Sequence, residues 1–479
     1  MLFNSLSFAI FLPIVFALYW LIPRRHIKMQ NILLLVASYY FYACWDYRFL
    51  FLLMFSTLLD YFSGLMMENT QSQGRKKFWF WASILINLGF LGVFKYYNFF
   101  VDSFAEGLSL LGIEASFTTL SVILPVGISF YTFHGLSYVI DIYYDRIKAE
   151  RSFVDYAVFV SFFPLLVAGP IERATHLLPQ IKKQRFFSYP NAVDGMRQIL
   201  WGLFKKIVIA DNCAQFANTI FEGHESQSGA TLMLGALFFT FQIYCDFSGY
   251  SDIALGVARL FGIELLRNFA FPYFSRDIAE FWRRWHISLT TWFRDYLYIP
   301  LGGSRGGMWM KIRNTFIIFL VSGFWHGANW TFIVWGFLNA LYFMPYLLLG
   351  NNRNNLGTVA EGKLFPSVKE FFQMVITFSL TVIAWIFFRS ENLTHAFTYI
   401  GNMFTRFEVE KPAIFPVFLI VLIILFMIVE WLGRHGKFAF SGLDASIKPR
   451  LLRWVFYIAI IFVIFAYGGK EQEFIYFQF

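Results

Sequence analysis

The sequence carries little charge for its length. Of its 479 residues only 14% are charged, whereas 58% are apolar and 22% are aromatic. A water-soluble protein averages about 25% charged residues and about 45 to 50% apolar ones. A chain of this size cannot cover so much hydrocarbon with so few charges. The composition therefore excludes most soluble folds and predicts a polytopic membrane protein.

Cysteine is nearly absent as well. Cys44, Cys213 and Cys245 lie within or beside apolar segments and form no CxxC pair. We therefore expect neither a disulfide framework nor a zinc site, and we expect the thiols to be small buried groups. The sequence also contains no GxSxG, P-loop or HExxH motif, so it gives no support to soluble hydrolase, kinase or metalloprotease mechanisms. We expect no bound metal and no resident cofactor.

The positive charge is distributed in a way that indicates a membrane. The chain has 39 Lys+Arg against 30 Asp+Glu, a net charge of +9, which invites comparison with nucleic-acid-binding proteins. The basic residues lie between apolar runs, however, as the positive-inside rule expects. We therefore predict membrane lipids and no nucleic acid as partners. The alternation of basic and acidic loops places both the N-terminus and the C-terminus outside the cytoplasm, and we read the first apolar run as a retained span.

The apolar runs predict about 10 to 12 spanning helices, because a span needs about 20 mostly apolar residues. The clearest candidates are 5 to 22, 30 to 45, 48 to 66, 78 to 101, 118 to 140, 195 to 222, 229 to 250, 314 to 350, 367 to 388, 412 to 433 and 451 to 468. The run 314 to 350 would measure roughly 55 Å as one helix, so we predict a break at HGAN, 326 to 329.

Two stretches do not fit simple spans. The segment 153 to 170 is followed by basic residues that belong inside, which predicts a re-entrant segment broken at AGPIER, 168 to 173. Between 251 and 313 the apolar runs are too short to cross, and we expect amphipathic or re-entrant helices near the cytoplasmic face. The predicted fold is thus all-α, a single integral membrane domain over residues 1–479.

His326 is the strongest candidate for chemistry. It lies in SGFWHGANW, at the predicted break in a span, between two glycines. Ionisable residues at membrane depth are functional candidates, and an imidazole with a pKa near 6.5 can act as general base and acid. Its position is equally compatible with a buried histidine that bonds a neighbouring carbonyl and holds two helices together.

His286 lies forty positions earlier, in FWRRWHISLTTWFRDYLYIPLGG, 281 to 303. A second imidazole there could bind an acyl donor or position His326, although a histidine at headgroup level among tryptophans is the simpler reading. The arginines of this motif can bind the phosphates of lipids or of a cytosolic donor. The candidates for a substrate path here and at the FWHG motif are Arg283, Arg284, Trp285, Arg294 and Trp325.

A polar cluster, YCDFSGYSDIALG at 244 to 256, is expected at the inner end of an apolar helix. Asp246, Ser248 and Tyr250 could line a cavity. Pairing of the acids with the arginines that follow is at least as good an explanation.

Taken together, YCDFSGYSDIALG, FWRRWHISLTTWFRDYLYIPLGG and FWHGANW, in this order, resemble the membrane-bound O-acyltransferase (MBOAT) family. The signature core covers about 125 to 340, and MLFNSLSFAIFLPIVF and FIYFQF extend the resemblance to nearly the whole chain. Within the family the chain is similar to the bacterial alginate- and peptidoglycan-acetylating members.

The resemblance implies an O-acetyltransferase in a bacterial cytoplasmic membrane. It implies catalytic roles for His326 and His286, and a ring of spanning helices around a thin central tunnel. It also implies that an acyl group, usually from acetyl-CoA, passes from the cytosol to an extracytoplasmic serine (SGNH-like) acyltransferase partner, which modifies an exported or cell-wall polysaccharide. The donor could also be another acyl thioester or acyl carrier.

The C-terminal tail, 469–479, is rich in aromatic residues and is expected outside. It could lie in the membrane interface. Alternatively it could tuck into an outer funnel, where the Tyr476 hydroxyl would accept the acyl group as a relay.

A lipid or polysaccharide transporter without catalysis is the alternative function, since many spans with interior polar groups would also suit transport. Transporters often contain paired half-repeats with broken helices in corresponding positions. No such repeat is visible, and the polar signatures crowd between 244 and 330. The sequence therefore favours an acyltransferase.

Overall fold

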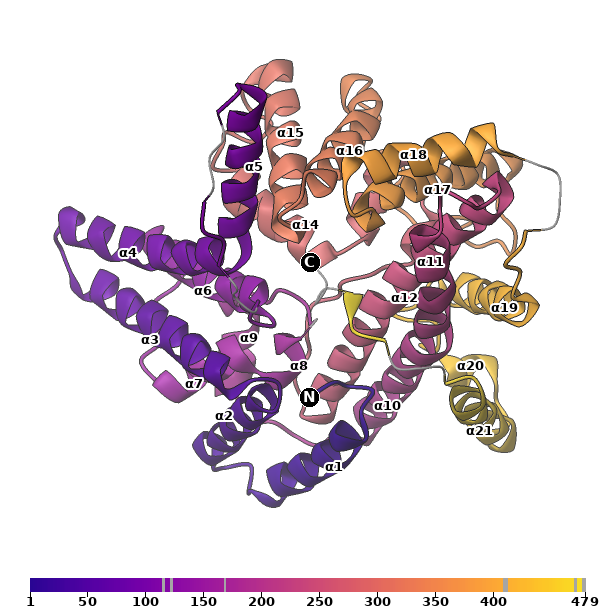
Figure 1. Ribbon diagram of the computed structural model, residues 1–479. Coiled ribbons are helices and arrows are strands. Elements are labelled where there is room, and N and C mark those ends of the chain that lie inside the picture. The colour runs from indigo at the N-terminus through magenta and orange to yellow at the C-terminus, as the bar shows by residue number, and fades with distance from the viewer. Residues whose placement is uncertain (114–116, 121–123, 168, 408–411, 469–471, 476–479) are drawn as a thin grey trace. The chain divides into compact units, whose positions relative to one another are not determined.

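The computed structural model describes residues 1–113, 117–120, 124–167, 169–407, 412–468 and 472–475, and within these ranges every regular element is a helix (Figure 1). The predicted all-α fold is confirmed. The described chain divides into two compact units, Met1–Ala192 with Val257–Leu266, and Val193–Gly256 with Arg267–Phe479.

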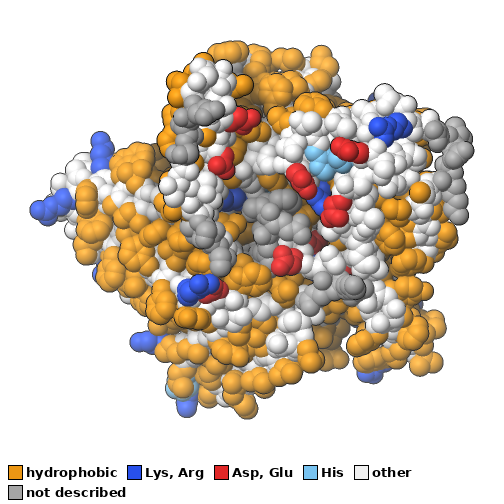
Figure 2. Space-filling view, in the orientation of Figure 1, with side chains coloured by type: hydrophobic (Ala, Val, Ile, Leu, Met, Phe, Trp, Pro, Cys, Tyr) orange, Lys and Arg blue, Asp and Glu red, His pale blue; other side chains and the backbone are white. Residues whose placement is uncertain are grey.

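The first unit is built from the N-terminal apolar runs. Its helices are α1 (Leu6–Leu21), α2 (Ile27–Ala43), α3 (Tyr47–Asn69), α4 (Gln73–Leu91), η1 (Gly92–Tyr96), α5 (Tyr97–Leu110), α6 (Ile128–Tyr143), α7 (Phe153–Ser161), α8 (Phe163–Leu166) and α9 (Ala174–Lys182). Hydrophobic side chains cover the outer surface of α1 to α4 (Figure 2), as expected for helices that face lipid. The predicted break near AGPIER is confirmed, since α8 ends at Leu166 and residues 169–173 are not helical.

The second unit holds the three signature motifs. Its helices are α10 (Tyr189–Leu203), η2 (Phe204–Ala210), α11 (Asp211–Glu222), α12 (Gly229–Leu260), η3 (Pro272–Phe274), α13 (Ile278–Arg284), α14 (Ile287–Phe293), η4 (Arg294–Tyr298), α15 (Gly307–His326), α16 (Trp330–Leu348), α17 (Val368–Arg389), α18 (Leu393–Thr405), α19 (Val417–Gly433), α20 (Leu443–Ser446) and α21 (Arg450–Ala466). The first residues of α10 and the last of α12 belong to the first unit.

Two helix boundaries were predicted wrongly. The span predicted over 118 to 140 begins only at Ile128, the first residue of α6. Helix α12 does not end near residue 250 but continues to Leu260, so Asp246 and Tyr250 lie in its middle. The physical reason is that lysines of η2 neutralise the acids of α12, which lets a buried helix carry them without ending. Helix α18 was not predicted, because its apolar residues follow one face of a short helix and do not form a continuous run.

Five helical stretches among the described residues are long and apolar enough to cross a bilayer: Tyr47–Asn69, Gln73–Leu110, Gly229–Leu260, Trp330–Leu348 and Val368–Arg389. Leu6–Leu21 and Val417–Gly433 are apolar but shorter. The chain is therefore a multi-pass membrane protein, while a total of 10 to 12 spans stays a prediction.

The break in the run 314 to 350 is confirmed and forms a helical hairpin. Helix α15 ends at His326 and α16 begins at Trp330, and the two helices lie side by side (Figure 1). A Cβ atom at Gly323 would lie 2.2 Å from the Phe332 carbonyl oxygen, and one at Gly336 would lie 2.3 Å from the Phe319 carbonyl oxygen. Only glycine allows this close approach, which fixes the end of α15 against α16.

Candidate active site

His326 is the last residue of α15 and is 4% exposed. Aromatic rings surround its imidazole. The ring centroid lies 4.8 Å from that of Trp325, 5.1 Å from that of Trp335 on α16, and 5.3 Å from that of Phe388 on α17. The end of the helix therefore places an imidazole ring within a cluster of aromatic side chains in the second unit.

His286 lies at the turn between α13 and α14, and its backbone is left-handed, with φ 42° and ψ 54°. Such a conformation costs about 1 to 3 kcal/mol for a residue other than glycine, and it persists only where the surroundings impose it. Asn268 imposes it here: its carbonyl accepts the Ile287 N–H at 2.9 Å, and its Oδ1 accepts the Ser288 hydroxyl at 2.6 Å. Backbone strain of this kind is typical of functional sites.

The two signature histidines come together. The centroids of the His286 and His326 rings are 6.5 Å apart, and Trp325 lies 6.0 Å from His286. His286 is 1% exposed and meets the Phe247 ring of α12 edge-on at 4.7 Å. The site is thus assembled from α12, the α13–α14 turn and the tip of the α15–α16 hairpin. This arrangement suits transfer of a proton inside an aromatic, water-poor site.

The predicted polar candidates of α12 lie in buried contacts with lysines. Asp246 pairs with Lys206 at 2.9 Å, and Ser248 accepts a hydrogen bond from Lys205 at 2.9 Å. The Tyr250 ring lies 5.6 Å from the Lys206 ammonium. Asp246 therefore pairs with a lysine of η2 and not with a following arginine, while its role in lining a cavity stays a prediction.

Glu430 is a residue that the sequence reasoning missed. It lies buried in α19, where its carboxylate accepts the Trp201 indole N–H at 3.1 Å and the Tyr244 hydroxyl at 2.7 Å. The available signal was a lone acid near the end of an otherwise apolar helix.

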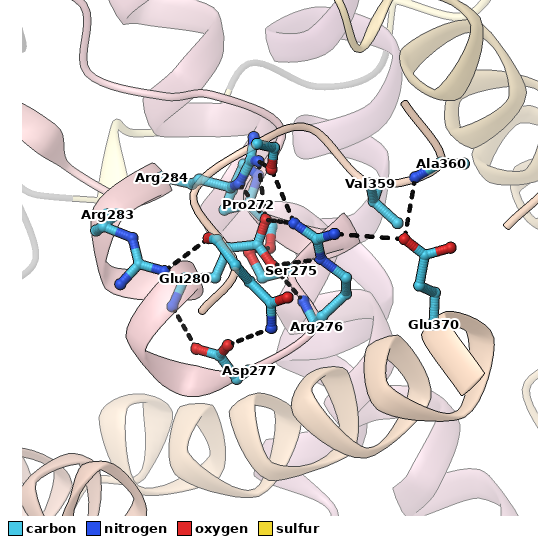
Figure 3. A network of polar contacts seen from close by, with 12 residues as sticks. Pro272, Ser275, Arg276, Asp277, Glu280, Arg283, Arg284, Val359, Ala360 and Glu370 are labelled. Atoms are coloured by element: carbon cyan, nitrogen blue, oxygen red, sulfur yellow. Dashed lines mark hydrogen bonds and ion pairs between the residues drawn. The ribbon is translucent and has the colours of Figure 1, made fainter. Parts of the chain in front are cut away.

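The signature arginines hold a loop (Figure 3). Arg284 bonds Glu280 and the Gly357 carbonyl, and Arg283 bonds the carbonyls of Asn352 and Asn355 at 2.7 and 2.8 Å. Glu280 also pairs with Arg276, which reaches Glu370 at the start of α17. These contacts fasten the chain between α16 and α17 to α13.

The remaining candidates lie apart from one another. Trp285 is 1% exposed and stacks on Phe281 at 5.5 Å, whereas Arg294 is exposed and pairs with Asp295 at 2.8 Å. Tyr476 lies outside the described residues. Phe474 and Ile475, just before it, are fully buried within the second unit. Among the described residues there is no group of three or more His, Cys, Asp or Glu that could hold a metal ion.

The comparisons with known proteins identify the family. Residues 144–375, which include both histidines, match the family model described as MBOAT, membrane-bound O-acyltransferase family. The chain is 41% identical over 407 residues to the probable alginate O-acetylase AlgI of Pseudomonas aeruginosa, covering 85% of this chain and 75% of that protein. The chain belongs to the membrane-bound O-acyltransferase family.

Two further relatives extend the comparison. The chain is 36% identical over 432 residues to the peptidoglycan O-acetyltransferase of Helicobacter pylori, covering 84% of this chain and 80% of that protein. It is 30% identical over 264 residues to the teichoic acid D-alanyltransferase of Streptococcus thermophilus, covering 51% of this chain and 62% of that protein. The chain is therefore an acyltransferase of the O-acetyltransferase type, and its membrane character follows from its apolar helices.

Proposed function

We propose that the chain takes an acetyl group from a cytosolic thioester, acetyl-CoA, and passes it across the bacterial cytoplasmic membrane for O-acetylation of an exported or cell-wall polysaccharide. The observation that carries the proposal is the pairing of His286 and His326 within one aromatic site, with ring centroids 6.5 Å apart. The names of the relatives support an acetyl group and a polysaccharide acceptor.

His326 is the general base in this proposal. Its imidazole takes the proton of an acceptor hydroxyl while the hydroxyl oxygen forms a bond to the thioester carbonyl carbon. The C–S bond then breaks, and the imidazolium returns the proton to the departing thiolate. The His286 ring lies next to the His326 ring, with centroids 6.5 Å apart. In this proposal His286 orients either the donor or His326. Burial among aromatic rings keeps water from competing for the acyl group.

An extracytoplasmic serine (SGNH-like) acyltransferase is the proposed partner that receives the acyl group. The tail is part of this delivery, with the Tyr476 hydroxyl as the proposed relay and with both termini outside the cytoplasm. Mass spectrometry of the C-terminal peptide tests the relay, because an acyl adduct on Tyr476 must accumulate when the partner is absent.

The test of the reaction uses purified full-length protein in proteoliposomes, with radiolabelled acetyl-CoA and the partner. We expect His326→Gln to abolish transfer of label to the partner, while His224→Gln, a change at a histidine outside the three motifs that stacks on His395, retains it. Undiminished transfer by His326→Gln would overturn the catalytic role. Polymer moved without any acyl transfer would favour the transporter.

A further inference from the structure

The tail enters the interior of the second unit just before the residues that the structure leaves undescribed. Phe474 and Ile475 are 0% exposed, although they belong to no long helix. Glu473 beside them is exposed. The segment 472–475 is therefore a short docked stretch of chain with one side open.

Main-chain groups at both ends of this segment are held by two side chains of opposite charge. The Ile475 N–H donates to the Asp246 carboxylate at 2.7 Å, and the Lys206 ammonium donates to the Gln472 carbonyl at 3.0 Å. Hydrogen bonds to charged groups are shorter and stronger than neutral ones. Both hydrogen bonds are made to main-chain groups, so they fix the position of the segment independently of its side chains.

Lys206 and Asp246 belong to a buried ion cluster. Lys206 lies 2.9 Å from Asp246 and 2.8 Å from Asp211, and the three side chains are 1%, 3% and 4% exposed respectively. They come from η2, α12 and α11. Buried charges are stable only when they are paired and hydrogen-bonded, and Lys206 supplies the opposite charge for both carboxylates of the cluster. The π-helical turn η2 carries Lys206, and such turns occur frequently at functional sites.

The docked segment also lies close to the histidines. The Phe474 ring centroid is 4.5 Å from that of Tyr250 and 6.2 Å from that of Phe247. Phe247 in turn contacts His286 at 4.7 Å. A single ring therefore separates the tail from the candidate active site.

We propose that Lys206 and Asp246 are positioning residues, which dock the segment 472–475 beside the His286–His326 site, and that this docking is required for acyl transfer. The requirement of docking for acyl transfer rests on the proposed function, whereas the docking itself does not. Docking itself is a property of the resting protein and is measured without turnover.

The experiment follows tail mobility and transfer in the same variants. A spin label is attached at Glu473→Cys in full-length protein in which Cys44 is replaced by serine. We expect an immobilised spectrum in this parent and a mobile one in Lys206→Met, which removes the donor to Gln472. Turnover with the partner is expected to fall by about tenfold to a hundredfold, with the KM for acetyl-CoA unchanged, because the loss is one of positioning.

Ile475→Pro is a second test that keeps the side chains of the ion cluster and removes the backbone donor, while also fixing φ at residue 475. Its matched control is Ile475→Ala, which keeps the N–H and loses the side chain. We expect the label to be mobile in the proline variant and immobilised in the alanine one.

Lys205→Met is the matched control for Lys206→Met. Lys205 is also buried, but it pairs with Asp252 at 2.6 Å and donates to the Ser248 hydroxyl, and both of these partners belong to α12. The label should stay immobilised in this variant. An immobilised label in both Lys206→Met and Ile475→Pro would overturn the docking, and released tails with undiminished turnover would overturn its role in transfer. Failure of the proposed reaction would instead show as inactive parent protein with an ordered tail.

Discussion

His134 and His326 are both buried, at 1% and 4% exposed, yet their surroundings differ in kind. His134, in the first unit, accepts the Glu172 backbone N–H at 3.1 Å through Nε2, and its Nδ1 faces the Val160 carbonyl at 3.4 Å. Both nitrogens are therefore occupied by backbone, with the proton on Nδ1. His326 lies among aromatic rings beside a second histidine. Burial is therefore common to both histidines, and what differs is the kind of group that surrounds each ring.

The largest expected effect is on acyl transfer, which should depend on His326 and not on His134. His326→Gln should lower acyl transfer by about 10² to 10⁴-fold, the usual contribution of a general base. His134→Gln should leave the turnover of the folded protein within about twofold of the parent value, since both ring nitrogens of His134 contact main-chain groups. Transfer rates per folded molecule, measured in proteoliposomes, check both values. Equal losses of acyl transfer in the two variants would contradict the proposed difference between His326 and His134.

The next effect concerns His286 and its left-handed backbone. Asparagine tolerates this conformation better than most residues, so His286→Asn should fold like the parent while losing about tenfold or more in transfer. His286→Val should also lose stability, because a β-branched residue is strained there. Thermal unfolding in detergent, alongside transfer rates, measures the two contributions. A stable His286→Val protein would show that Asn268 does not impose the turn.

Stability is where His134 should matter. His134→Leu leaves the Glu172 N–H without its acceptor, which should lower the free energy of unfolding by about 1 to 3 kcal/mol. Denaturant unfolding of the purified protein gives this value. A change at His134 that lowered activity without lowering stability would contradict the structural role.

The smallest expected effect lies at His176, which contacts the same residue, Glu172, as His134 does. Its Nδ1 meets the Glu172 carboxylate at 2.8 Å, and this hydrogen bond raises the pKa of His176 above its ordinary value. The stabilisation is therefore complete below about pH 6.5 and is lost as the pH rises through the raised pKa. Because the side chain is 36% exposed, we expect less than about 1 kcal/mol.

Melting temperatures between pH 5.5 and 9 test this pair. The parent should lose a small increment across that range, and His176→Gln should not. An identical profile in the two proteins would show that the pair contributes nothing.

Several features of the fold could be predicted from local sequence. The length of the run 314 to 350 required a break, and HGAN was the polar interruption available, so the end of α15 at His326 was predictable. Gly169 and Pro170 likewise predicted the interruption before α9. The extension of α12 was not predictable, because it depends on Lys205 and Lys206, which lie about 40 residues earlier and neutralise its acids.

The candidate site shows the same division. The sequence alone determined that the chain is an apolar, helical membrane protein and which two histidines lie in aromatic motifs, since composition and spacing are properties of the chain itself. Only the tertiary structure decided that His286 and His326 meet, that Arg283 and Arg284 hold a loop, and that Asp246 grips the tail. Each of these contacts joins segments that are far apart in the chain. Such contacts depend on how the helices pack, and a local sequence pattern carries no information about that packing.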